Sequence, residues 1–335
     1  LGDVYKRQGY VPTTYTRIRE QNLAGYAQYN HPLPFGQANI GLRYEHVDFD
    51  YFENGTFVPG QSRVYDNIFP NISVNGQLGK VQFQVSYAAK TQRPNYSQLR
   101  NNITYANRFT WQTGNPLLKP SVTHDITAVG VWRFFQAMVS YKVVRDYILY
   151  WGTQVENQSA TTLINYINHD RLPSLTVMLA ASPTIGIWNL NASAIVMKQW
   201  FSLDAAGQRR TYNNPLFVGS LNNTFTLPAG FLLSADFNYQ SRGQVQNITL
   251  KRPQYTLNIG LRKSLFNDAL SIEARANDLL LGCKQEALLY MESAQMKDLS
   301  WSDTRSFSLT VRYKFNAAKS KYKGTGAGQD TINRM

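Results

Sequence analysis

The chain has 335 residues, of which 43% are hydrophobic and 13% aromatic, and its formal net charge is +13. No stretch approaches the roughly 18 apolar residues of a transmembrane helix, which excludes a helical membrane protein. A single cysteine, Cys283, excludes an internal disulfide framework and a cysteine-based metal site. The basic residues are dispersed and form no nucleic-acid-binding motif. We therefore assign the positive charge to a polar lumen and loops, or to attraction toward anionic lipid or solute.

The first strands are predicted from alternation of apolar and polar residues, the period-two pattern of a β-strand. Residues 1–8 match no pattern that follows, and we interpret them as a non-native scar of sequence assembly. A turn with two prolines and a glycine at 31–36 separates the first two alternating segments. We expect the first four strands at residues 23–30, 38–45, 65–74 and 81–90.

The long segment from Gln92 to Pro120 contains Arg-Pro, Gly-Asn-Pro and Lys-Pro steps, so it is not one continuous strand. Loops of this length in a compact domain are usually functional or disordered. Its arginines and aromatic side chains suit an anionic or ring-bearing solute, through charge-assisted hydrogen bonds and stacking. An alternative is that these residues anchor the loop and contact lipopolysaccharide at the rim. The candidate residues of this extracellular ligand loop are Arg93, Tyr96, Arg100, Tyr105, Arg108, Phe109 and Trp111.

Nine further strands are expected after this loop. A polar loop is predicted at 152–159, and a polar excursion containing Cys283 and Met296 precedes the last strand. That strand has large apolar residues at every odd position, and Ser, Thr, Arg and Lys at the even positions. The apolar residues of the last strand are Phe307, Leu309, Val311, Tyr313 and Phe315. The nine strands are expected at 123–133, 135–142, a seventh ending at 175–179, 188–196, 217–227, 233–240, 255–262, 270–275 and 307–315.

Short turns and long loops alternate along the chain. Outer-membrane barrels show this asymmetry, with short periplasmic turns and longer extracellular loops. A soluble sandwich would have shorter strands and turn signals every 8–12 residues or so. Most segments here supply the roughly 9–11 residues that cross a bilayer as a strand. The sequence therefore predicts an all-β, antiparallel transmembrane β-barrel in the bacterial outer membrane, in contact with lipid and lipopolysaccharide.

Four motifs carry a resemblance to a known family. Residues 86–99 (SYAAKTQRPNYSQL) and 114–120 (GNPLLKP) resemble the mid-barrel signature of TonB-dependent outer-membrane receptors, in the Bacteroidota-type outer membrane protein β-barrel family. Residues 276–279 (ANDL) and 311–316 (VRYKFN) are similar to the closing hairpin of that family. The likeness covers the chain from about Tyr15 onward. Two positions, Ser121 and Leu280, depart from the family pattern, in which an acidic and an aromatic residue are common.

The resemblance implies a plug domain and a 22-stranded barrel, of which this chain is the C-terminal fragment with about 13 strands. The partners it implies are the protein's own N-terminal plug, the inner-membrane energy-coupling protein TonB, and the barrel assembly machinery, which reads the terminal Phe315. We accordingly divide the chain into the scar, a barrel over 9–316 and a basic periplasmic tail over 317–335, for which a solvated disordered end is the alternative.

No catalytic constellation, nucleophile motif or phosphate-binding glycine pattern occurs, so we expect no enzyme, no cofactor and no metal site. The resemblance implies a receptor for energy-coupled uptake of a scarce solute, such as an iron chelate, a cofactor or an oligosaccharide. The alternative is a passive channel or a surface-adhesion barrel without a plug. Four inward basic residues are expected either to guide the solute or to pair with the plug and neighbouring strands. They are Arg43, Lys90, Arg262 and Arg275.

Overall fold

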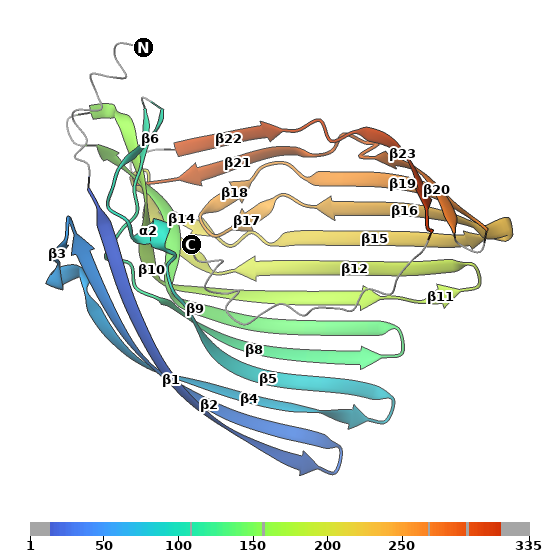
Figure 1. Ribbon diagram of the computed structural model, residues 1–335, viewed down its shortest axis with the longest axis horizontal. Coiled ribbons are helices and arrows are strands. Elements are labelled where there is room, and N and C mark those ends of the chain that lie inside the picture. The colour runs from blue at the N-terminus through green and yellow to red at the C-terminus, as the bar shows by residue number, and fades with distance from the viewer. Residues whose placement is uncertain (1–13, 108, 156–157, 267–268, 293–294, 316–335) are drawn as a thin grey trace.

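The computed structural model describes residues 14–107, 109–155, 158–266, 269–292 and 295–315, which form a curved antiparallel wall (Figure 1). Thirteen long strands follow one another in chain order, and each pairs antiparallel with the next. The all-β barrel architecture predicted from alternation is confirmed. Within these residues no pairing joins the first long strand to the last, so both are edges. The long strands are β1 (Thr16–Leu33), β2 (Gly36–Glu53), β4 (Arg63–Leu78), β5 (Val81–Gln92), β8 (Ser121–Trp132), β9 (Phe135–Val155), β10 (Gln158–Ala181), β12 (Trp188–Gln199), β15 (Leu216–Leu227), β16 (Phe231–Gln240), β19 (Gln254–Leu265), β20 (Leu270–Asn277) and β23 (Ser306–Tyr313).

The two ends of the wall differ, as the sequence predicted. One end, at the right of Figure 1, carries short turns such as those between β4 and β5 and between β8 and β9. The other end carries long loops with strands and helical turns of their own. In the described part of the chain, no helix has the length and apolar character needed to cross a membrane. The loop elements are β3 (Thr56–Phe57), η2 (Pro59–Gln61), α2 (Tyr96–Leu99), β6 (Thr104–Asn107), β7 (Thr110–Gln112), β13 (Phe201–Ala205), β14 (Gln208–Tyr212), β17 (Gly243–Val245), β18 (Ile248–Leu250), β21 (Lys284–Tyr290) and β22 (Gln295–Trp301); at the turn end lie β11 (Thr184–Ile185) and η3 (Pro228–Gly230).

One face of the wall is apolar and the other polar, because directly paired residues on neighbouring strands point to the same side. Leu221, Phe237 and Leu257 lie side by side on β15, β16 and β19. Leu309 lies opposite Ala274 and is 70% exposed. A continuous row of exposed large apolar side chains suits lipid and not water. The sequence therefore set the facing of these strands through its period of two.

Two strands extend well beyond their neighbours at the loop end. β8 pairs with β9 only as far as Arg145, and β12 pairs with β10 only from Ser174 onward. Beyond these residues β9 and β10 pair only with each other on this side and form a two-stranded ribbon. β9 ends at Val155 and β10 begins at Gln158. The predicted loop at 152–159 is therefore wrong over most of its length. The ribbon is extended because both of its faces are covered: Leu149 and other residues pack on β13 and β14, and Ile148 and others pack on the loop that follows β5.

Candidate functional site

The segment predicted to bind solute, residues 92–120, folds onto the inner face of β2. Phe49 and Tyr51 are buried there against Leu99 and Leu118. These two β2 residues have the same parity as Glu45, and the opposite parity to the exposed outward side chains of Ile40, Leu42 and Tyr44. The loop therefore fills the loop end of the lumen and does not project away from the wall.

Arg93 fixes the start of this segment through two buried ion pairs. Its Nη1 lies 3.1 Å from Oε1 of Glu20 on β1, and its Nη2 lies 2.8 Å from Oε2 of Glu45 on β2. The three side chains are 17%, 11% and 8% exposed, respectively. Glu45 also pairs with Arg43 at 2.7 Å. Two cations and two anions thus balance, which is what burial of charge requires.

The Gly-Asn-Pro step joins α2 to the ribbon. A Cβ at Gly114 would lie 2.4 Å from the carbonyl oxygen of Gln98 and 2.5 Å from that of Arg100, so only glycine fits between these backbone atoms. The next residue, Asn115, donates its backbone N–H to the Gln98 oxygen over 2.6 Å. Its Nδ2 donates to the carbonyl oxygen of Tyr166 on β10 over 2.8 Å. The motif therefore clamps the helix turn between its own loop and β10.

Tyr96 and Arg100 lie at the start and just past the end of α2. A capping box orders this single turn: the Asn95 side chain accepts from the Gln98 N–H, and the Gln98 side chain accepts from the Asn95 N–H. Tyr96 and Arg100 line a hollow of about 410 Å³ at the loop end of β1. The other residues that line it are Thr14, Tyr15, Thr16, Ile18 and Asn102.

Arg100 is the chemically distinctive group of this hollow. Its Nη2 donates to Oγ1 of Thr104 over 3.3 Å. Its Nε is buried and has no hydrogen-bond partner among the described residues. A buried donor without an acceptor is costly, so this Nε is an unsatisfied group of the loop, and the rest of the guanidinium carries the charge that an anion would meet. The hollow therefore combines a guanidinium group with the rings of Tyr15 and Tyr96.

The other predicted site residues lie elsewhere in the same loop. The rings of Tyr105 and Trp111 meet edge to face at 5.1 Å across β6 and β7. Trp111 pairs in register with Leu163 of β10, and Phe109 is 48% exposed beside them. Arg108 lies outside the described residues. The six predicted residues that the structure describes therefore divide into an anchor, the hollow and an aromatic cluster.

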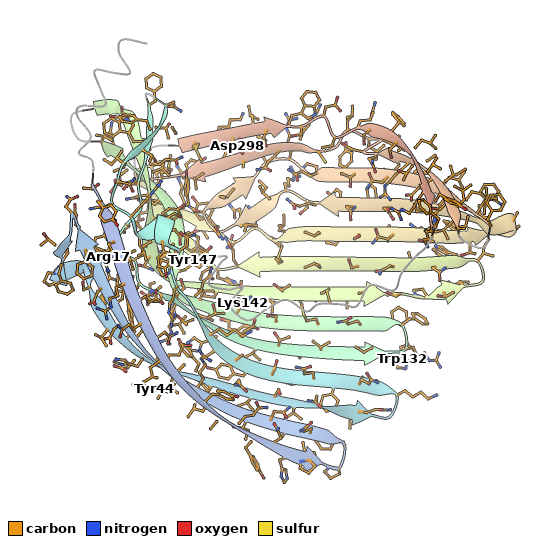
Figure 2. The ribbon with its side chains drawn as sticks, viewed as in Figure 1. Arg17, Tyr44, Trp132, Lys142, Tyr147 and Asp298 are labelled. Carbon is orange, nitrogen blue, oxygen red and sulfur yellow. The ribbon has the colours of Figure 1, made fainter. Side chains whose placement is uncertain are left out.

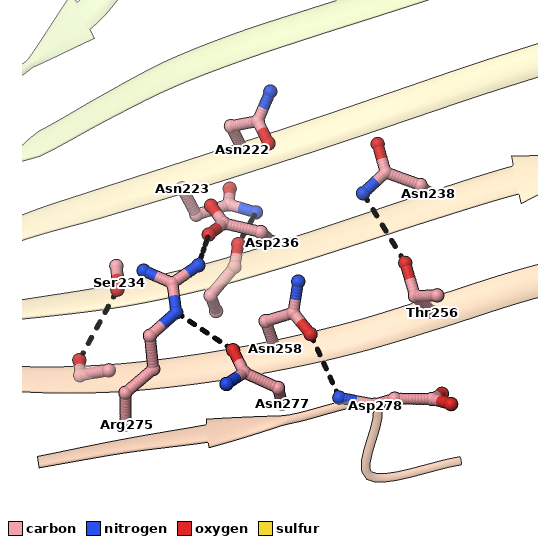
Figure 3. A network of polar contacts seen from close by, with 12 residues as sticks. Asn222, Asn223, Ser234, Asp236, Asn238, Thr256, Asn258, Arg275, Asn277 and Asp278 are labelled. Atoms are coloured by element: carbon pink, nitrogen blue, oxygen red, sulfur yellow. Dashed lines mark hydrogen bonds and ion pairs between the residues drawn. The ribbon is translucent and has the colours of Figure 1, made fainter. Parts of the chain in front are cut away.

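The inward basic residues differ in their pairing. Arg275 contacts Oδ2 of Asp236 at 3.3 Å and donates from Nε to Oδ1 of Asn277 over 2.9 Å (Figure 3). Its partners lie on its own strand, β20, and on β16, so this charge is satisfied within the wall. Lys90 and Arg262 form no ion pair among the residues that the structure describes. They are the inward cations left available to other groups.

The Asn-Asp-Leu step of the closing hairpin is also structural. The Asp278 side chain is buried and accepts from Oγ1 of Thr304 over 2.5 Å. Its backbone N–H donates to Oδ1 of Asn258 over 2.9 Å (Figure 3). These bonds tie the loop between β20 and β23 to β19. In the described part of the chain, no group of three or more His, Cys, Asp or Glu side chains is placed to hold a metal ion.

A wall of antiparallel strands with an apolar outer face, a polar inner face and loops at one end defines a transmembrane β-barrel. Residues 10–313 match the outer membrane protein beta-barrel family, and the chain belongs to that family. It is therefore a protein of the bacterial outer membrane. No curated protein matches the sequence.

Three solved structures share the fold at low sequence identity. The copper transporter OprC matches with a TM-score of 0.60 and 12% identity, over 89% of this chain and 48% of its own. The FrpB iron transporter from Neisseria meningitidis (F5-1 variant) matches with a TM-score of 0.57 and 16% identity, over 89% and 46%. The siderophore receptor PiuA from Acinetobacter baumannii matches with a TM-score of 0.57 and 11% identity, over 90% and 44%. The chain spans less than half the length of these transporters and receptors.

Proposed function

We propose that the intact protein is a TonB-dependent outer-membrane receptor of the Bacteroidota type, which takes up a scarce solute with energy from the inner membrane. The observation that carries this proposal is the hollow at the loop end, which Arg100 lines together with Tyr15 and Tyr96. The fold shared with proteins described as iron and copper transporters and a siderophore receptor supports it.

The chemistry of the hollow favours an anionic or ring-bearing solute. The guanidinium of Arg100 supplies charge-assisted hydrogen bonds, and Tyr96 and Tyr15 supply rings for stacking or phenol groups for hydrogen bonding. Elsewhere on the wall, the inner face offers polar side chains such as Asn222 on β15 and Asn238 on β16, which a polar solute can contact. An N-terminal plug within a 22-stranded barrel, and coupling to TonB, complete the proposed machine.

Binding and transport are expected to separate when they are tested in the native host. Arg100→Gln should weaken binding of labelled ferric chelates, cobalamin or oligosaccharides, whichever the wild type retains, by about tenfold, the scale of a charged hydrogen bond. Lys119→Gln is the matched control, because Lys119 is an exposed cation of the same segment outside the hollow. Deleting TonB should abolish uptake and leave surface binding intact. Uptake that survives this deletion would show a passive channel, and binding without any uptake would show an adhesion barrel.

A further inference from the structure

The outward face of the wall has an apolar groove near the short turns, across β8, β9, β10 and β12. It has a volume of about 570 Å³. Its floor is made of small residues that neighbouring strands bring together, among them Gly130 opposite Ala137, and Ala192 opposite Ala181. A Cβ added at Gly130 would meet no atom within 4 Å, so the floor is open there.

Two cations lie at one corner of this groove. Val81 on β5 and Trp132 on β8 line it and pair with each other in register. The residues next to them in the turns are Lys80 and Arg133, so both cations stand just beyond the same paired position. Neither forms an ion pair among the described residues, and the Arg133 guanidinium lies 5.1 Å from the centre of the Trp132 ring. Figure 2 shows Trp132 at the short-turn end of the wall.

The depth of these groups in the membrane identifies the chemistry of the occupant. Aromatic residues of outer-membrane barrels gather at the headgroup level, and Trp132 stacks on Phe135 there with ring centres 5.9 Å apart. Since Lys80 and Arg133 follow this level in the turns, we expect them at the depth of lipid phosphates, with the groove running from them toward the hydrocarbon region. The connections at 34–35, 79–80, 133–134 and 182–187 contain no Asp or Glu, so no carboxylate there competes for the cations.

We propose that the groove binds one phospholipid with an anionic headgroup. One acyl chain lies on the floor formed by Gly130, Ala137 and Ala192, and the phosphate group contacts Lys80 and Arg133. The occupant is a phospholipid because hydrocarbon lining and phosphate-binding cations occur together at one place on a lipid-facing surface. This site is separate from the loop-end hollow and does not depend on which solute the protein takes up.

The test uses the full-length protein in phosphatidylcholine vesicles that contain a trace of spin-labelled phosphatidylglycerol or spin-labelled phosphatidylcholine. Electron paramagnetic resonance measures the motionally restricted lipid. The wild type should prefer phosphatidylglycerol, and Lys80→Gln and Arg133→Gln should each reduce that preference by about fivefold, the contribution expected of one basic residue near an anionic lipid surface. Lys284→Gln, a cation change at the loop end, should leave it unchanged.

A second pair of variants tests the groove itself. Gly130→Leu fills the floor and should lower the restricted population for both lipids, and Ala235→Leu, which faces outward on β16 outside the groove, should not. Heat-modifiable migration of the folded barrel on gels confirms that each variant is assembled. Unchanged selectivity after both charge substitutions, or unchanged restricted lipid in Gly130→Leu, would each overturn the proposal.

Discussion

Replacing Arg93 with alanine is expected to release segment 92–120 from the inner face while the wall stays folded. Arg93 holds Glu20 at 3.1 Å and Glu45 at 2.8 Å, and all three side chains are largely buried. Removing one partner from a buried ion pair costs about 3–5 kcal/mol, because the remaining charge stays buried without its counterion. Glu45 keeps Arg43 at 2.7 Å, so the cost should lie near the lower bound, at about 3 kcal/mol.

Hydrogen exchange of the backbone amides in segment 92–120 measures this free-energy cost. A change of about 3 kcal/mol multiplies the equilibrium population of the opened loop by roughly a hundred. The backbone N–H of Leu118, which donates to the carbonyl oxygen of Asn115, should therefore exchange about a hundredfold faster in Arg93→Ala. Amides within the β4–β5 pairing should keep their rates, because that part of the wall does not depend on Arg93.

The matched control is Lys90→Ala, which removes the same charge from the neighbouring strand β5. Lys90 forms no ion pair within the described ranges, so exchange in the loop should change by less than about threefold. Equal exchange rates in Arg93→Ala and Lys90→Ala would refute the reasoning, because the effect would then follow net lumen charge and not the two contacts of Arg93.

Two further predictions concern the terminal strand and the loop sheet. Leu309→Arg in the full-length protein should lower the free energy of unfolding by about 2–4 kcal/mol if Leu309 lies near the bilayer midplane. Thr310→Arg should be close to neutral, because Thr310 pairs with Glu273 on the polar face. A folding titration in lipid that gives equal costs for the two variants rejects the facing. In the loop sheet, the hydrogen bond from Lys297 is the main cause that lowers the pKa of Glu286 below its ordinary value of 4.5. The stability from this group is present above that value and lost as pH falls through the lower folded pKa. Acid should therefore lower the hydrogen-exchange protection factors of β21, which are corrected for the intrinsic pH dependence of amide exchange, in the wild type and change them less in Glu286→Gln.

The alternation of the sequence was sufficient to predict the order of the thirteen long strands and the facing of those in which apolar and polar residues alternate clearly. Side-chain direction in a strand has a fixed period, and short connections force antiparallel neighbours. Strand ends were predicted less well, because they depend on contacts made far along the chain. β9 runs through Gly152 because a buried Met291 covers that point, with its Sδ 2.3 Å from where a Cβ would stand. The residues of 152–159 themselves give no sign of this contact, because Met291 is far away in the sequence.

The site was predicted as a segment and not as an arrangement of residues. Composition and length indicated 92–120, and the structure places that segment at the loop end of the lumen. The ion pairs that make Arg93 an anchor of the loop could not be predicted, because its partners Glu20 and Glu45 lie 73 and 48 residues away in the sequence. The contribution of Tyr15 to the hollow was missed for the same reason, since only the path of β1 brings it to α2.

The motifs that carry the family resemblance hold the loops in place. Gly114 fits between two carbonyl oxygens, and Asn115 ties α2 to β10. Asp278 closes the loop between β20 and β23 through Thr304. None of these groups lines the hollow around Arg100. These three motif residues are therefore scaffold residues, whereas Tyr96 of the 86–99 motif also lines the hollow. If the hollow receives a solute as proposed, these motif residues hold the loops around it, and the choice of solute depends on other lining residues such as Arg100 and Tyr15.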